Sequence, residues 1–272
     1  MYFHCYKVRV TEGMEMDIKK DVQQQFGKSA EMYVNSPVHK EGNDLQRMVR
    51  LAELDGDTEL LDIATGGGHT ANAFAPFVKK VTALDLTLEM IEAAERFIKG
   101  NGHKNVSFIR GDAEDLPFQD ELFDIVTCRI APHHFPDVNK FVEEVHRILK
   151  MNGQFLLDDN VVPEDDEFDQ FYNTIERLRD FSHFRAWKKT EWIRMLELSG
   201  FDIIEWHRFE KTFQFEPWCN RMKLLLPDKE KLTRFILSST PKIKNKFKID
   251  IEDQEVISFQ GEAFILKAIK KN

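Results

Sequence analysis

LLDIATGGGHT, residues 60–70, joins a short apolar run to three consecutive glycines. A glycine-rich turn between a strand and a helix exposes backbone N–H groups and is the usual cradle for a phosphate. Read from Gly66 to Ala71, it also fits the G-x-G-x-x-A form of the dinucleotide-binding fingerprint. Asp62, however, lies four residues before the first glycine, where a carboxylate would repel a pyrophosphate. The stretch therefore predicts a cofactor loop and leaves the cofactor open.

The chain around this loop alternates between short apolar runs and amphipathic stretches. Strands are predicted at residues 59–64, 81–85, 106–112, 123–128 and 154–159. Helices are predicted after the first, second and fourth of these strands and also at residues 164–180 and 190–199. Such alternation requires right-handed crossovers and produces a parallel, doubly wound sheet. Two later strand-like stretches, 201–215 and 258–271, are not joined by such a crossover, and we expect them to pair antiparallel at the edge of the sheet.

The chain is predicted to form one domain with four parts. Residues 1–15 show neither helical nor strand periodicity, and we interpret them as a non-native or disordered extension before a true start at Met14 or Met16. The other parts are N-terminal helices, a core that carries the glycine loop, and later helices with a basic insertion and the last two strands: residues 16–56, 57–160 and 161–272.

The composition indicates an acidic globular protein. Its 272 residues are 42% hydrophobic, enough for a buried core, and 38 Lys+Arg against 47 Asp+Glu give a net charge of −9. This charge, and a sequence without an aromatic stacking platform, argue against nucleic acid as a partner. The basic stretch from Lys223 to Asp250 is interpreted as a solvated helical face.

The cysteines and apolar runs indicate a protein of the reducing cytoplasm. Cys5, Cys128 and Cys219 are odd in number and form no C-x-x-C pair, so neither a disulfide framework nor a zinc site is expected. No apolar run in the sequence is long enough to span a bilayer, and the first residues lack the features of a signal peptide. We expect a cytoplasmic protein with no integral membrane association.

The residues that follow the predicted strands mark the ligand site, because open α/β sheets bind ligands at the carboxyl ends of their strands. Those ends carry Asp62, Asp85, Asp112 and Arg129. Asp85 follows Gly68 at the distance where an acid can bind both hydroxyls of a ribose. This arrangement suits NAD and other adenosine cofactors alike.

Asp62 and Asp112 favour S-adenosylmethionine over NAD. This cofactor has an adenosine end but no phosphate, and it carries an ammonium, a carboxylate and a sulfonium. Asp62 would attract the cationic end, directly or through water, while bare glycine backbone lets the amino-acid tail lie close. Asp112 can accept a hydrogen bond from the adenine amino group, and the Ala113 N–H can serve a ring nitrogen.

Five segments in this order resemble the class I S-adenosylmethionine-dependent methyltransferases: LLDIATGGGHT, VTALDLTLEM, GDAEDLPF, FDIVTCRIAPHHF and LKMNGQFLL. They are most similar to the UbiE-like branch of small-molecule enzymes, which includes ubiquinone and menaquinone C-methyltransferases. The resemblance runs from about Gln25 to Leu157. It implies a Rossmann-like α/β fold, with a mostly parallel seven-stranded sheet, an antiparallel edge strand, and a helical lid over residues 16–56.

The resemblance also implies cofactor-binding residues, including two in the lid-like segment FGKSAEMY: Phe26, Tyr33, Asp62, Thr65, Gly66, Gly68, Asp85, Leu86, Met90, Asp112, Ala113, Arg129 and Ala131. In this family Leu86 and Met90 would flank the adenine, and Arg129 and Ala131 would border the methionine end. The chain departs from the family at Ala64, where glycine is usual, and we expect a slightly reshaped turn there.

His133 and His134 follow the fourth predicted strand, on the side where a methyl acceptor would meet the cofactor. A histidine with a pKa near neutrality could remove a proton from a phenol, enol or amine as it is methylated. In the alternative reading, one histidine packs beneath the cofactor and the other faces solvent. No metal site is expected, since adjacent histidines lack the usual ligand spacing.

The segment LRDFSHFRAW, residues 178–187, is the second cluster of chemically active side chains. Predicted substrate contacts are Tyr172, His183, Arg185 and Trp187. Arg185 could clamp a substrate carboxylate or form an ion pair between helices. Because these residues lie outside the cofactor motifs, we expect substrate choice there. The nearby aromatic residues suggest a small aromatic or apolar acceptor.

The predicted reaction is in-line transfer of a methyl group from S-adenosylmethionine to a small-molecule acceptor, leaving S-adenosylhomocysteine. Two alternatives remain open at this point. One is an NAD-dependent oxidoreductase that uses the same glycine fingerprint, and the other is a protein that binds S-adenosylmethionine without catalysis. The sequence leaves a homodimer open as well.

Overall fold

The computed structural model describes residues 12–28, 30, 34 and 42–271, which contain one mixed β-sheet. The strand order is β3-β2-β1-β4-β5-β9-β7, with β6 paired to β5 and β8 paired to β9. The strands are β1 (Glu59–Ile63), β2 (Lys80–Asp85), β3 (Val106–Arg110), β4 (Phe123–Arg129), β5 (Leu149–Val162), β6 (Trp187–Lys188), β7 (Phe201–Gln214), β8 (Asp250–Glu252) and β9 (Glu255–Lys270).

The strands on the β3–β5 side of the sheet are parallel, and β9 alone on the path to β7 runs in the opposite direction. β1 pairs parallel with β2 and β4, and the parallel pairing extends to β3 on one side and β5 on the other. β9 pairs antiparallel with both β5 and β7. The predicted class I fold, with its seven-strand path and antiparallel pairing at the edge, is therefore confirmed. β7 forms the edge, and the reversed strand β9 lies one position inside it.

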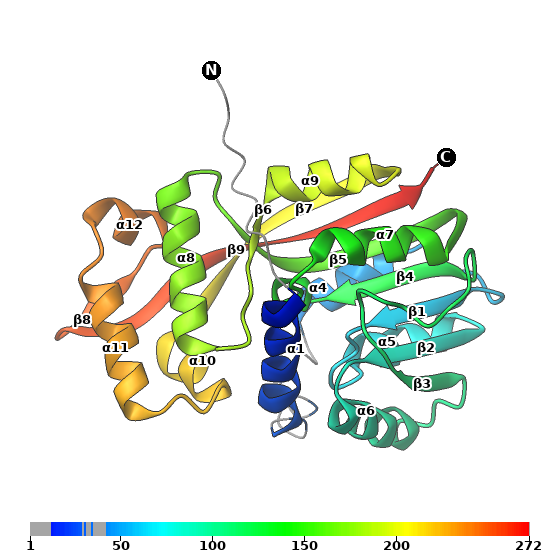
Figure 1. Cartoon of the computed structure of the whole chain (residues 1–272), viewed down its shortest axis with the longest axis horizontal. Helices are drawn as coiled ribbons and strands as arrows, with labels where there is room; N and C mark the ends of the chain where they lie inside the picture. Colours follow the sequence, from blue (N-terminus) through cyan, green and yellow to red (C-terminus); the bar gives the residue numbers. More distant parts are fainter. Residues whose placement is uncertain (1–11, 29, 31–33, 35–41, 272) are drawn as a thin grey trace.

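Helices cover both faces of the sheet, as Figure 1 shows. They are α1 (Glu12–Gly27), α4 (Asn43–Leu51), α5 (His69–Phe74), α6 (Leu88–Gly100), α7 (Val138–Ile148), α8 (Asp166–Arg179), α9 (Lys189–Leu198), α10 (Phe215–Arg221), α11 (Leu226–Leu237) and α12 (Pro241–Lys246). Short 3₁₀ turns occupy Ala75–Phe77 and Pro132–His134.

Alternation along the strands builds two apolar layers, because successive strand residues point to opposite faces. Leu61 and Val126 belong to the layer that packs against α7 and α9. Leu60 and Ile125 belong to the layer that packs against α4, α5 and α6. Near-continuous apolar runs in the central strands thus reflect a sheet that is buried on both faces.

A second apolar cluster lies where β7 and β9 extend beyond β5. The β5–β9 pairing ends at Val161 and Glu262, while β7 continues to pair with β9 as far as Gln214 and Ser258. α8, α10, α11 and α12 pack around this extension, on the left of Figure 1. The basic insertion therefore forms helices around an apolar core, with its charges outside.

α1 lies between these two parts of the molecule (Figure 1). The Gln23 side chain donates to the Leu86 carbonyl at 3.2 Å, and the Gln25 side chain lies 3.0 Å from the Met222 sulfur. α1 begins at Glu12, so its first turn precedes the predicted boundary at residue 16. Residues 1–11 and Tyr33 lie outside the described residues. Within the described part, no helix combines the length and apolar character that a membrane crossing needs.

Candidate functional site

The glycine loop between β1 and α5 depends on left-handed backbone conformations. Gly66 has φ +54° and Gly68 has φ +82°, a region that side chains disfavour. A Cβ on Gly68 would also lie 2.9 Å from Ile98 Cδ1 and 3.0 Å from Ala94 Cβ. The loop can therefore approach α6 closely only because Gly68 has no side chain.

Ala64 also has a positive φ, +53°. A left-handed conformation costs a residue with a Cβ about 1–2 kcal/mol, which explains why glycine is usual at this position. The turn nevertheless forms, since Thr65 N donates to the Leu84 carbonyl and Gly68 N to the Thr65 carbonyl.

Ala64→Gly is expected to stabilise the protein by about 0.5–1 kcal/mol, because relief of the left-handed strain exceeds the added entropy of the unfolded chain. Denaturant unfolding measures this change. Ala73→Gly in α5 is the matched control and should destabilise the protein by about 1 kcal/mol, since glycine weakens a helix. Destabilisation by Ala64→Gly would contradict the assigned strain.

Asp62 lies beneath the loop, and its carboxylate is 1% exposed. It accepts hydrogen bonds from Thr65 Oγ1 at 2.6 Å, Thr127 Oγ1 at 2.7 Å and Ala71 N at 3.2 Å. Burial raises its pKa to about 6. Asp62 does not line the cavity and holds the loop in shape; that it attracts the cofactor's cationic end, directly or through water, stays a prediction.

Asp85, at the end of β2, faces the cavity beside the loop. Its carboxylate accepts Gly66 N at 2.9 Å and Thr87 N at 2.9 Å. Burial raises its pKa to about 6. A carboxylate has roughly four acceptor positions, so Asp85 can hold the loop and still accept two hydroxyl groups.

Most of the predicted cofactor residues come together around this first cavity. Its lining includes Phe26, Thr65, Gly66, Asp85, Leu86, Met90, Asp112, Ala113, Arg129 and Ala131. Gly68 lies behind the loop against α6, where it shapes the turn. Segments distant in sequence thus meet at the carboxyl ends of β1, β2 and β4, where a doubly wound sheet binds its ligand.

Lys19 of α1 also lines this cavity, although nothing in the sequence pattern marked it as a site residue. Its ammonium lies 2.8 Å from Asp112 Oδ2 and 2.5 Å from Glu114 Oε2. The Asp112 carboxylate also accepts Glu114 N at 2.9 Å. α1 is therefore fastened over the end of the cavity where adenine was predicted, which agrees with a lid.

The Arg129 guanidinium contacts two carboxylates, one from α4 and one from β5. Its guanidinium donates to Asp44 Oδ2 of α4 at 2.7 Å and 3.0 Å and lies 3.5 Å from Asp158 Oδ2. Burial alone would raise the pKa of Asp44, but Arg129, a hydrogen bond with Asp158 and the charge of Lys211 bring it down to about 2. Ile130, the next residue, has φ +54°, an uncommon conformation for a β-branched residue. The end of β4 is thus a constrained turn that faces the cavity.

The two histidines after β4 have different partners. His133 Nδ1 lies 2.6 Å from Asp159 Oδ1, and His134 Nδ1 lies 2.9 Å from the Ser182 carbonyl. A ring nitrogen that contacts a carbonyl must donate, so Nε2 is the acceptor of neutral His134. The alternative in which one histidine faces solvent is wrong, because both are buried.

The surroundings shift the pKa values of these histidines in opposite directions. Burial alone would lower the pKa of His133, but the Asp159 carboxylate raises it above its ordinary value. Burial, together with the charge of His133, lowers the pKa of His134 to about 4. His133 is therefore the stronger base of the two, and His134 stays neutral at physiological pH.

A second cavity of about 880 Å³ adjoins the first. Phe26, Ile130 and His134 line both cavities. His133 lines only the second, with Phe209, Phe213 and Trp218 among its aromatic walls. Two ligands held in these cavities would meet beside His134.

The four predicted substrate residues do not line either of the two cavities. Tyr172 is 1% exposed and packs in the second apolar cluster. His183 Nε2 contacts Asn173 Oδ1 at 2.9 Å. Arg185 pairs with Asp169 at 2.8 Å and with Glu191 at 3.3 Å, and its guanidinium lies 5.1 Å from the centre of the Trp187 ring. The ion-pair alternative for Arg185 is the one observed.

Comparison with known proteins agrees with this geometry. Residues 61–157 match the family described as "Methyltransferase domain". The chain is 38% identical to the uncharacterized methyltransferase YcgJ of Bacillus subtilis over 90% of this chain and 98% of that protein. The crystal structure of YcgJ superposes with a TM-score of 0.81 and covers 84% of this chain and 98% of that one.

Two further relatives differ in their sequence identity to this chain and in how much of it they cover. A Bacillus halodurans C-125 protein, classed as a methyltransferase, is 54% identical with a TM-score of 0.83 and covers 85% of this chain and 100% of its own. The demethylmenaquinone methyltransferase of Porphyromonas gingivalis is 32% identical over 47% of this chain and 54% of that enzyme.

Proposed function

Because this chain belongs to the S-adenosylmethionine-dependent methyltransferases, we propose that it transfers a methyl group between its two adjoining cavities. The first cavity would hold the cofactor and the second a small-molecule acceptor. The observation that carries this proposal is the shared wall of Phe26, Ile130 and His134, where the two ligands would meet. When bound, S-adenosylmethionine supplies an electrophilic methyl group on a sulfonium.

The residues of the first cavity fit this cofactor. The loop around Gly66 leaves room for an amino-acid tail, and Asp85 has acceptor positions left for the ribose hydroxyls. Leu86 and Met90 would flank the adenine, with Asp112 and the Ala113 N–H at its edge. These assignments follow the resemblance residue by residue.

The second cavity supports a small acceptor with an aromatic or apolar part. Its volume of about 880 Å³ is within the range of small-molecule sites, roughly 300–1,000 Å³. Phe209, Phe213 and Trp218 offer ring surfaces for stacking. Named relatives include demethylmenaquinone methyltransferases, so hydroquinones and phenols are the first acceptors to test.

We assign proton removal to His133, held by Asp159. The carboxylate accepts from Nδ1 at 2.6 Å and so leaves Nε2 as the basic atom. The proton leaves the acceptor's nucleophilic oxygen, nitrogen or carbon as the methyl group arrives. Neutral His134, between the cavities, would accept a hydrogen bond and exclude water from the path of transfer.

Purified protein should release S-adenosylhomocysteine from S-adenosylmethionine in the presence of at least one member of a panel of hydroquinones, phenols and amines. Methyl label should appear in the acceptor at the same rate. Binding of S-adenosylhomocysteine without transfer to any class would support the non-catalytic alternative. Turnover of NADH would support the oxidoreductase alternative.

A further inference from the structure

On the partly covered side of β7, a lysine lies in the sequence between two phenylalanines that share that side. Phe209, Lys211 and Phe213 alternate with exposed residues and line the second cavity. The Lys211 ammonium lies 5.4 Å from the centre of the Phe209 ring and 3.5 Å from Asn160 Oδ1. In the part of the chain that the structure describes, no carboxylate forms an ion pair with Lys211.

Three of the acids that line the same cavity form ion pairs with other cations. Asp44 pairs with Arg129 at 2.7 Å, and Glu176 pairs with Arg179 at 2.7 Å. Glu210 pairs with Lys248 at 3.0 Å. None of these carboxylates forms an ion pair with Lys211, although its charge contributes to the lowered pKa of Asp44.

A fourth acid, Asp180, also lines the cavity, and Asp158 lies near it. Asp180 accepts Ser182 N at 2.9 Å and Ser182 Oγ at 2.6 Å. Burial raises the pKa of Asp158 to about 7, so this carboxyl carries only part of a charge near neutrality. The charge of Lys211 works against this rise in the pKa of Asp158, but neither acid forms an ion pair with the Lys211 ammonium.

α4 adds positive charge to the same cavity. Arg47 and Arg50 are one helical turn apart, both exposed, and both line it. Arg47 contacts His207 Nδ1 at 2.7 Å. The basic side chains of the lining are Arg47, Arg50, Arg179, Lys211 and Arg221. This concentration of cations occurs in a chain whose net charge is −9.

We propose that the methyl acceptor carries an anionic oxygen group, a carboxylate or a phosphate, that Lys211 binds in the second cavity. The inference rests on the proposed function, because it assigns the acceptor of that reaction. Lysine acts as a point charge and suits either anion. The rings of Phe209 and Phe213 would hold the apolar part. With both ends fixed, the nucleophile is oriented toward His133 and His134, which is the alignment that methyl transfer requires.

Calorimetric titration of the full chain, saturated with S-adenosylhomocysteine, tests this inference with benzoate, phenyl phosphate and the uncharged benzamide. At least one anion should bind ten or more times more tightly than benzamide. The tighter of the two anions identifies carboxylate or phosphate as the recognised group. Lys211→Met should weaken anion binding by about tenfold or more, while Lys211→Arg should largely restore it.

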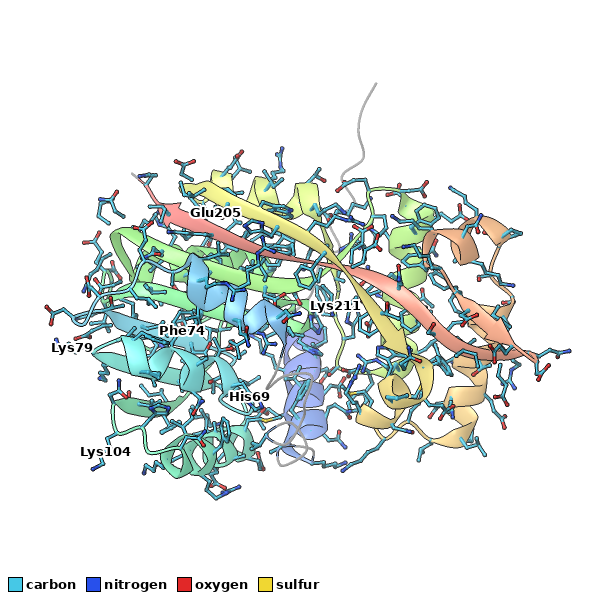
Figure 2. The ribbon with its side chains drawn as sticks, turned by 180° about the vertical axis from the view of Figure 1, so that it is seen from behind. His69, Phe74, Lys79, Lys104, Glu205 and Lys211 are labelled. Carbon is cyan, nitrogen blue, oxygen red and sulfur yellow. The ribbon has the colours of Figure 1, made fainter. Side chains whose placement is uncertain are left out.

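Lys104→Met is the matched control, because Lys104 is exposed and lies far from Lys211 in Figure 2. It should leave anion binding unchanged. Equal binding of benzamide and the anions, an unchanged affinity in Lys211→Met, or no anion binding at millimolar concentration would each overturn the inference. Retained binding of S-adenosylhomocysteine and transfer to an uncharged acceptor would then leave the proposed function standing.

Discussion

Asp85→Ala is expected to weaken the binding of S-adenosylhomocysteine by at least about 100-fold, since each hydrogen bond to a charged group contributes about 1.5–3 kcal/mol. The variant would lose the acceptor for the two ribose hydroxyls. It would also lose the acceptor for the Gly66 N–H, which lies 2.9 Å from the Asp85 carboxylate in the original protein. The same residue thus binds the ligand and fixes the loop. Calorimetric titration measures the change in affinity.

His134→Ala is the matched control for this experiment. His134 is in the wall between the cavities, and its ring contacts Ser182 and Phe26 rather than the glycine loop. We expect the affinity of the His134→Ala variant for S-adenosylhomocysteine to stay within a few-fold of that of the original protein. Equal losses in both variants would assign the histidine to the cofactor site and contradict the division of roles.

His133→Ala is expected to lower the rate of methyl transfer by about 10²–10⁴-fold, the usual contribution of a general base. Binding of S-adenosylhomocysteine should be unaffected, because His133 lines only the second cavity. Single-turnover measurement of methyl transfer separates the chemical step from binding. A rate within a few-fold of the original would remove His133 from the mechanism.

The pH–rate profile adds a test of the Asp159 partner. Only the neutral form of His133 is a base, and Asp159 raises its pKa above the ordinary 6.5. Activity should therefore fall as pH drops through a value above 6.5. In Asp159→Asn the imidazolium loses its counter-charge, so its pKa falls and the loss of activity moves to lower pH. An unmoved profile would mean that another group takes the proton.

The strand order could be predicted because each strand–helix unit is local in sequence. The predicted strands agree with β1, β2, β3 and β4 to within two residues at either end. β5 is longer than predicted, since it begins at Leu149 and continues through Asn152 and Gly153. Asn152 has φ +63°, so the turn signal was correct locally, but pairing with β4 resumes after a register shift.

The cofactor cavity was also largely predictable, because its residues follow strands whose carboxyl ends must meet. The sequence could not show which side chains these site residues contact. Asp159 reaches His133, Asp44 reaches Arg129, and Lys19 reaches Asp112 only through tertiary packing. In the sequence, a carboxylate or a lysine that will form such a contact cannot be told apart from one that will face solvent in the same amphipathic stretch.

The predicted substrate residues lie outside both cavities for a related reason. Tyr172 and Arg185 were placed at the substrate because aromatic and basic residues cluster there, but the same types build helix cores and ion pairs. The second cavity instead uses β7, where Phe209, Lys211 and Phe213 share one side of a strand. Their period-two spacing, with a lysine in an otherwise apolar row, was the signal available in the sequence.

Titration of the purified protein with S-adenosylhomocysteine, with NADH as the comparison ligand, tests the central claim most directly. The loop around Gly66, with Asp85 beside it, was assigned to an adenosine cofactor that has an amino-acid tail and no phosphate. We predict micromolar binding of S-adenosylhomocysteine and no binding of NADH. Binding of NADH, or the absence of binding by S-adenosylhomocysteine, would contradict the assignment of the first cavity.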